Sequence, residues 1–195
     1  MRALLVLTLF LGLTPFAVAA TTLEDSKFLS LAEALELAFP ECEFQRESVF
    51  LTKEQVVKAE KLAGGKIESR LLLRFTATRK KAGEEPKLAG WAYVDTHKVR
   101  AKRETLLILV NPDDSIRRIE VLAFAEPLEY LPRANWYAQF LDKKLDKDLR
   151  IKRDIKNVSG ATLTADATTR SVRRVLSVHQ ITLRPDRDKE EKTDK

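Results

Sequence analysis

The sequence predicts an α+β fold with a central antiparallel sheet flanked by helices. Three observations support this class. Two segments near the start carry helix signals, the middle of the chain alternates apolar and polar residues, and a long amphipathic segment lies near the end. Strands joined by short turns pair antiparallel, and helices then cover the apolar faces of the sheet.

The first residues resemble a secretory signal peptide. An apolar run at residues 3–13 follows Arg2, and the small residues 17–20 offer an A-x-A cleavage site after Ala19. The run is too short to span a bilayer comfortably. We therefore predict a leader at residues 1–19, a mature start near Ala20 and a periplasmic location. An uncleaved N-terminal anchor is the alternative.

The rest of the chain is long enough for one hydrophobic core. We expect an N-terminal helical segment at residues 20–69, packed on the same domain as residues 70–184, and a charged, disordered tail at residues 185–195. Cys42 is the only cysteine, which excludes an internal disulfide framework and an iron–sulfur cluster. Any redox chemistry must therefore come from a bound cofactor.

The charge pattern argues against nucleic acid as a partner. The net charge is +6, but acidic and basic residues alternate along the chain. The densest basic stretch, residues 143–153, contains Asp146 and Asp148 and lacks aromatic residues for base stacking. His97 and His179 are the only histidines, and they are too few and too far apart in sequence to predict a metal site.

Two short helices have clear sequence limits. Ser30 precedes a periodic apolar segment at residues 31–39, and Pro40 ends it. Thr52 and Gln55 form a capping-box pattern before a helix that ends at residues 64–65, both glycine.

The middle of the chain predicts strands at residues 70–79, 88–94, 104–110 and 116–124. The last two should pair as a hairpin through the turn at residues 111–114.

The C-terminal part predicts two further helices. A short aromatic helix contains Trp136, Tyr137 and Phe140. The final helix is expected to have Thr164 as its N-cap and Asp166 in its first turn. Its predicted apolar face consists of Ala165, Thr168, Val172, Val175, Leu176 and His179.

The segment before this final helix is the candidate functional site. Residues 159–162 read Ser-Gly-Ala-Thr, and the free N–H groups and positive dipole of a helix N-terminus favour a phosphate there. Gly160 allows the backbone to approach such a group closely. The Thr162 hydroxyl is a candidate for a phosphoester. From spacing alone, an ordinary turn followed by a helix cap is the alternative.

Residues 158–164 resemble the flavinylation motif of the FMN-binding domain found in sodium-translocating NADH:quinone oxidoreductase, in the Rnf complex and in exported relatives. In that family a flavin transferase, using FAD and a divalent metal, esterifies the threonine to the phosphate of FMN. The resemblance implies covalent FMN on Thr162, surrounded by Ser159, Gly160, Ala161 and Thr164.

The resemblance extends over residues 88–176. Residues 90–93 are similar to the glycine-aromatic strand of the family, residues 116–123 to the following strand, and residues 126–127 to its glutamate-proline element. It implies that Gly90, Tyr93 and Glu126 lie near the flavin. Residues 39–52 also resemble stand-alone exported members.

One position departs from the family pattern: Lys156 occupies a site that is usually acidic. This departure puts recognition by the transferase in question.

These features predict an exported flavoprotein that relays electrons to a membrane or periplasmic redox partner. No residue is a convincing catalytic acid, base or nucleophile, so a carrier is favoured over a self-sufficient enzyme. The alternatives are a secreted binding module without a cofactor and an FMN-dependent reductase. Four aromatic residues are candidates for a flavin pocket or for ordinary core packing: Trp91, Tyr93, Trp136 and Tyr137. The sequence leaves open the donor, the acceptor and the oligomeric state.

Overall fold

The structure, a computed structural model, describes residues 28–184. The predicted leader at residues 1–19 and the predicted tail at residues 185–195 lie outside this range. Within residues 28–184, no helix is both long and apolar enough to cross a membrane.

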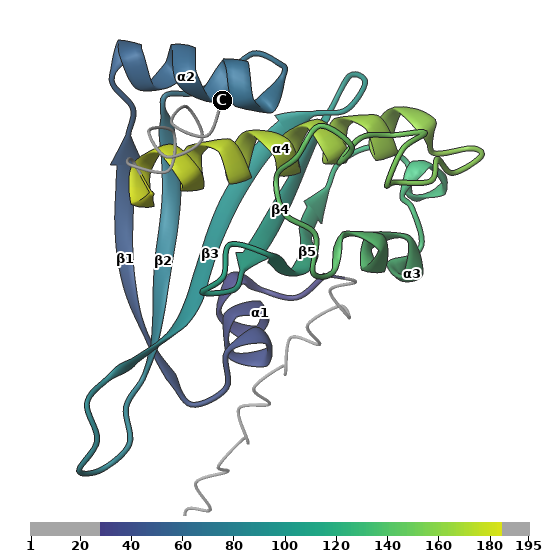
Figure 1. Ribbon diagram of the computed structural model, residues 1–195. Helices are drawn as coiled ribbons and strands as arrows, with labels where there is room; N and C mark the ends of the chain where they lie inside the picture. The colour runs from purple at the N-terminus through teal and green to yellow at the C-terminus, as the bar shows by residue number, and fades with distance from the viewer. Residues whose placement is uncertain (1–27, 185–195) are drawn as a thin grey trace, which may run out of the picture.

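The centre of the molecule is a five-stranded antiparallel sheet whose strands follow one another in chain order (Figure 1). The sheet confirms the predicted α+β class with a central antiparallel sheet. Its strands are β1 (Cys42–Phe50), β2 (Leu71–Arg79), β3 (Lys87–Lys98), β4 (Arg103–Val110) and β5 (Ile116–Phe124).

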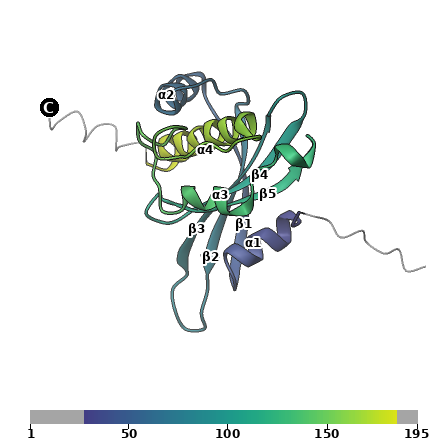
Figure 2. The ribbon, with the colours of Figure 1, turned by 90° about the vertical axis from the view of Figure 1, so that its right-hand side faces the viewer.

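Helices cover both faces of this sheet. The long helix α4 (Thr162–Leu183) and the shorter α2 (Lys53–Ala63) lie on one face, and α1 (Leu31–Ala38) lies on the other (Figure 2). Beyond β5 the chain forms three short turns of helix, namely η1 (Leu128–Tyr130), α3 (Ala134–Tyr137) and η2 (Ala138–Phe140).

Local sequence signals explain the first two helices. Ser30 and Glu33 form a reciprocal capping box at the start of α1, and Thr52 and Gln55 form another at the start of α2. The α2 helix ends at Gly64, whose φ of 66° is a left-handed conformation that glycine adopts without steric cost. These features confirm both predicted helices.

Strand β4 contributes side chains to the hydrophobic clusters on both faces of the sheet. Leu106, Ile108 and Val110 belong to the cluster beneath α4, whereas Leu107 and Leu109 belong to the cluster beneath α1. All five are fully buried, because successive side chains of a strand point to opposite faces and helices cover both. The predicted apolar face of α4 is also buried.

The predicted hairpin is confirmed. Strands β4 and β5 pair antiparallel, with Val110 opposite Ile116. The Asn111 N–H closes the turn by donating to the Ser115 carbonyl at 2.8 Å.

Strand β1 was missed by the sequence analysis, which predicted a helical N-terminal segment. Most of its residues are exposed, because β1 lies at the edge of the sheet and carries Glu43, Arg46 and Glu47. Charged edge strands prevent unwanted sheet pairing, and they lack the alternation by which strands are recognised.

Candidate functional site

Helix α4 begins at Thr162, three residues earlier than the predicted N-cap at Thr164 implies. Its N-cap is Ala161, and the expectation that Thr164 is the N-cap is wrong. Thr164 lies inside the first turn with no exposed surface, and its hydroxyl donates to the Tyr130 carbonyl at 2.6 Å. This hydrogen bond fixes the start of α4 against η1. Asp166 lies beyond the first turn and pairs with Arg170 on the helix surface.

The start of α4 differs from the starts of α1 and α2 in having no side-chain cap. The backbone N–H groups of Thr162, Leu163 and Thr164 have no acceptor within residues 28–184. Such free N–H groups, together with the positive end of the helix dipole, favour a bound anion. The structure therefore leaves this helix end able to hold a phosphate.

The Thr162 hydroxyl is accessible at this helix end. The side chain is exposed, and its hydroxyl donates only a long hydrogen bond of 3.3 Å to the Val158 carbonyl. The neighbouring Gly160 has a φ of 83°, and a side chain in that backbone conformation would be strained. Ala161 is buried and anchors the loop, whereas Ser159 is exposed.

A cavity of about 430 Å³ opens beside this loop. We call it the Thr162 pocket, since Ser159 and Ala161 line it next to the Thr162 backbone. Its apolar wall includes Trp136, whose indole N–H donates to the Lys156 carbonyl at 2.7 Å. The cavity lies within the usual size range of small-molecule sites. Its lining residues are Glu129, Leu131, Pro132, Arg133, Asn135, Trp136, Gln139, Lys156, Asn157, Val158, Ser159 and Ala161.

Glu126 does not line the Thr162 pocket. Its buried carboxylate accepts hydrogen bonds from the backbone N–H groups of residues 100–102, at 3.2, 2.7 and 2.7 Å. These hydrogen bonds, led by that of Lys102, lower the pKa of Glu126. They order the turn between β3 and β4, where Arg100 lies 4.8 Å from the Tyr130 ring centre. Glu126 thus supports the η1 turn that Thr164 contacts.

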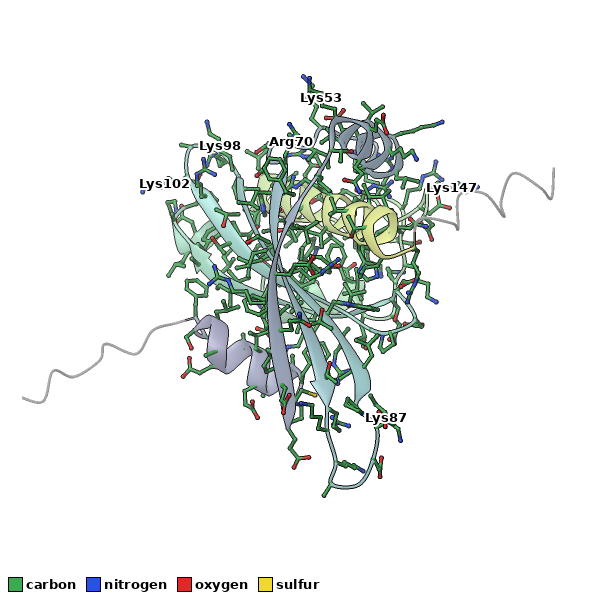
Figure 3. The ribbon with its side chains drawn as sticks, turned by 90° about the vertical axis from the view of Figure 1, so that its left-hand side faces the viewer. Lys53, Arg70, Lys87, Lys98, Lys102 and Lys147 are labelled. Atoms are coloured by element: carbon green, nitrogen blue, oxygen red, sulfur yellow. The ribbon has the colours of Figure 1, made fainter. Side chains whose placement is uncertain are left out.

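The β3–β4 turn also contributes positive charge to this end of the molecule. Lys102 lies on it and Lys98 ends β3 just before it, and both side chains point outward into solvent (Figure 3).

Gly90 and Tyr93 are not brought to this site. A side chain at Gly90 would meet the Val110 carbonyl oxygen at 2.4 Å, so glycine is required by strand packing. Tyr93 is fully buried, and its hydroxyl bonds to His179 Nδ1 at 2.7 Å. His179 and Thr162 are about 25 Å apart along α4. Trp91 packs on the same histidine, at 4.8 Å between ring centres.

The structure also contains a buried polar cluster that the sequence analysis missed. His97 Nδ1 lies 3.0 Å from Asp95 Oδ2, and its Nε2 lies 3.1 Å from Glu104 Oε2 without hydrogen-bond alignment. Hydroxyl groups from α3 and α4 complete the cluster, since Tyr137 and Thr168 both donate to Glu104. In sequence, only the shared strand face of residues 95 and 97 signalled it. The cluster fixes α4 to the sheet, because buried charges need such partners.

Comparison with known protein families finds a match to a segment in the second half of the chain. Residues 101–177 match the family model of the FMN-binding domain. This match confirms the resemblance and supports FMN as the ligand. The matched segment begins in the β3–β4 turn and contains Glu126 and Thr162, whereas Gly90 and Tyr93 precede it. No curated protein matches the chain.

The residues at the start of α4 fit the FMN that this domain implies. The three free N–H groups suit the phosphate, and the apolar wall formed by Trp136 and Leu131 suits an aromatic ring.

Proposed function

We propose that this protein carries FMN through a phosphoester to the Thr162 hydroxyl and relays electrons outside the cytoplasm. The observation that carries the proposal is the exposed Thr162 hydroxyl at an uncapped helix end, inside the segment that matches the FMN-binding domain. The Thr162 pocket next to it offers room for part of the flavin.

The residues of the site would act mainly by binding and orientation. The N–H groups of residues 162–164 would donate to phosphate oxygens. A bound flavin supplies the electron chemistry. In the maturation step, the Thr162 oxygen forms a bond to the flavin-side phosphorus of FAD, and AMP leaves. The hydroxyl proton is lost, which removes the hydrogen bond from Thr162 to the Val158 carbonyl. Because this hydrogen bond is long, its loss costs little free energy.

Export and electron relay rest on two further arguments. The first 19 residues have the pattern of a leader. A covalent bond also suits a carrier outside the cytoplasm, because a released flavin would be hard to replace there. The partner is a membrane-bound or periplasmic redox protein.

Co-expression with a flavin transferase tests the attachment. The exported protein should become yellow, and its fluorescence should survive denaturing electrophoresis. Its mass should rise by one FMN less one water, and the added mass should map to the peptide that contains Thr162. The variant Thr162→Ala should lose the label while its unfolding free energy changes by less than about 0.5 kcal/mol, as expected for an exposed side chain.

One variant controls for changes in the loop. Thr162→Ser keeps a hydroxyl at the same position and should restore much of the label. A label that persists in Thr162→Ala would refute the attachment site. A colourless wild-type protein beside an active transferase would instead favour the cofactor-free binding module.

A further inference from the structure

A second and larger cavity runs along the free edge of β5. Its volume is about 830 Å³, and we call it the β5 groove. One wall is strand β5 at residues 117–121, and the other is formed by η1, α3 and the chain between them. Leu29 and Phe28 close one end.

The β5 groove is apolar inside and charged at its margin. Its lining includes the apolar residues Ile119, Val121, Leu128, Leu131 and Leu141. Leu128 and Leu141 are 47% and 55% exposed, and both line this groove, so they form part of one exposed apolar patch. Exposed apolar surface of this kind commonly marks a binding site.

Of the three arginines at the margin, Arg133 alone has neither an ion pair nor a ring contact within residues 28–184. Arg118 pairs with Glu120, and Arg117 stacks on the Phe39 ring at 4.8 Å. Arg133 forms no ion pair with any residue between positions 28 and 184, and the carboxylate of Glu129 lies at the same margin. Arg133 is therefore available to donate hydrogen bonds to oxygen atoms of a ligand.

The wall of the groove is already fixed in place. The Tyr137 ring forms part of it, and its hydroxyl donates to the fully buried Glu104 at 3.2 Å. The adjacent Trp136 is held by its hydrogen bond to the Lys156 carbonyl. A preformed wall binds a rigid, flat ligand without a large ordering cost.

We propose that the β5 groove binds a planar aromatic molecule that carries carbonyl oxygens, of the quinone class, with Arg133 donating to a carbonyl. The apolar surface matches the ring, the volume suits a small molecule, and the guanidinium matches the oxygen atoms. This site is distinct from the Thr162 pocket, although residues 129 and 131–133 line both cavities. The proposal does not depend on flavin attachment.

Equilibrium dialysis of the flavin-free protein with menadione, a small naphthoquinone, tests this site. Menadione should bind, and Leu128→Glu should weaken its binding about tenfold or more, equivalent to about 1.4 kcal/mol, by placing a charge in the apolar surface. The matched control is Leu88→Glu. Leu88 is 41% exposed on β3 and does not line the groove, so menadione binding by this variant should stay within about twofold of wild type.

Two further measurements test the role of Arg133 and the separateness of the site. Arg133→Gln should weaken menadione severalfold but leave 2-methylnaphthalene, which has the same ring and no carbonyls, unchanged. Equal losses for both compounds would contradict the proposed hydrogen bond. The flavin-loaded protein should still bind menadione. Absence of menadione binding by the wild-type protein would overturn the proposal. Loss of menadione binding in the flavin-loaded protein would also overturn it, because the groove would then belong to the flavin site.

Discussion

Thr162 and Thr164 are identical side chains two positions apart, and the structure gives them opposite environments. Thr162 is exposed at the first position of α4, whereas Thr164 is buried and bonded to the Tyr130 carbonyl. Sequence reasoning singled out Thr162 by its motif but assigned the cap to the wrong residue. The reason is that Ala161, which has no capping side chain, occupies the N-cap position.

Lys156 is the residue at which this chain departs from the family pattern, and the structure explains why the fold accepts it. Its backbone is fixed on both sides, because its N–H donates to Gln139 Oε1 at 2.8 Å and its carbonyl accepts from Trp136. Its side chain is exposed and forms no ion pair within residues 28–184. The side chain at this position is therefore free to affect modification without affecting folding.

We predict that Lys156→Asp increases the rate of flavin attachment severalfold. The family resemblance implies that an acidic side chain here assists a transferase that uses a divalent metal, and a carboxylate attracts such an ion where an ammonium group repels it. Time courses of fluorescent labelling measure the rate.

The matched control for this prediction is Lys147→Asp, which makes the same charge change. Lys147 is exposed and points into solvent on the opposite side from Lys98 and Lys102 (Figure 3). A slower rate in Lys156→Asp, or an equal increase in both variants, would show that position 156 has no specific role in recognition.

At the scale of the elements, the helices and turns that were predicted correctly are those with local sequence signals. Helices α1 and α2 have capping boxes, and the turn at residues 111–114 has turn-forming residues, so the sequence predicted all three. Strand β1 has neither alternation nor turn signals and is defined by its pairing with β2. The Thr162 pocket joins residues 129–139 to residues 156–161, a contact that no local pattern encodes.

The polar cluster between α4 and the sheet predicts an unusual pH dependence of stability. Burial alone would lower the pKa of His97, but the hydrogen bond to Asp95 and the nearby negative charges of Asp95 and Glu104 outweigh it and raise that pKa. Asp95 has a pKa of about 2: burial would raise it, but His97, Arg174 and Ser171 lower it, so it stays ionised. Protonated His97 therefore stabilises the fold fully below the unfolded pKa of 6.5, and this contribution is lost as pH rises through the folded pKa.

We expect His97→Gln to destabilise the protein more at about pH 5.5 than at about pH 8.5. His179→Gln is the control with the opposite sign. Burial lowers the pKa of His179, so its contribution is present above pH 6.5 and decreases below it. Urea unfolding of both variants and wild type at the two pH values gives the differences. Parallel trends in the two variants would contradict this assignment.

At the scale of the whole molecule, one arginine joins three segments that are distant in sequence. Arg173 lies on α4 and is almost fully buried. Its Nε donates to the Ala63 carbonyl at 2.7 Å and its Nη2 to the Leu62 carbonyl at 3.1 Å, both at the end of α2. Its Nη1 donates to the Asp146 carbonyl at 2.5 Å. The guanidinium thus satisfies carbonyls that the end of a helix leaves without partners.

We predict that Arg173→Met lowers the unfolding free energy by about 3 kcal/mol, because it keeps most of the side-chain volume but leaves buried carbonyls without donors. Arg170→Met makes the same substitution one turn earlier on α4, removes only an exposed ion pair with Asp166 and should cost less than about 1 kcal/mol. Urea denaturation measures both changes. Hydrogen exchange should also show faster opening of α2 in Arg173→Met, since α2 packs chiefly on α4. Equal stability of the two variants would mean that side-chain packing between α2 and α4, and not Arg173, holds these two helices together.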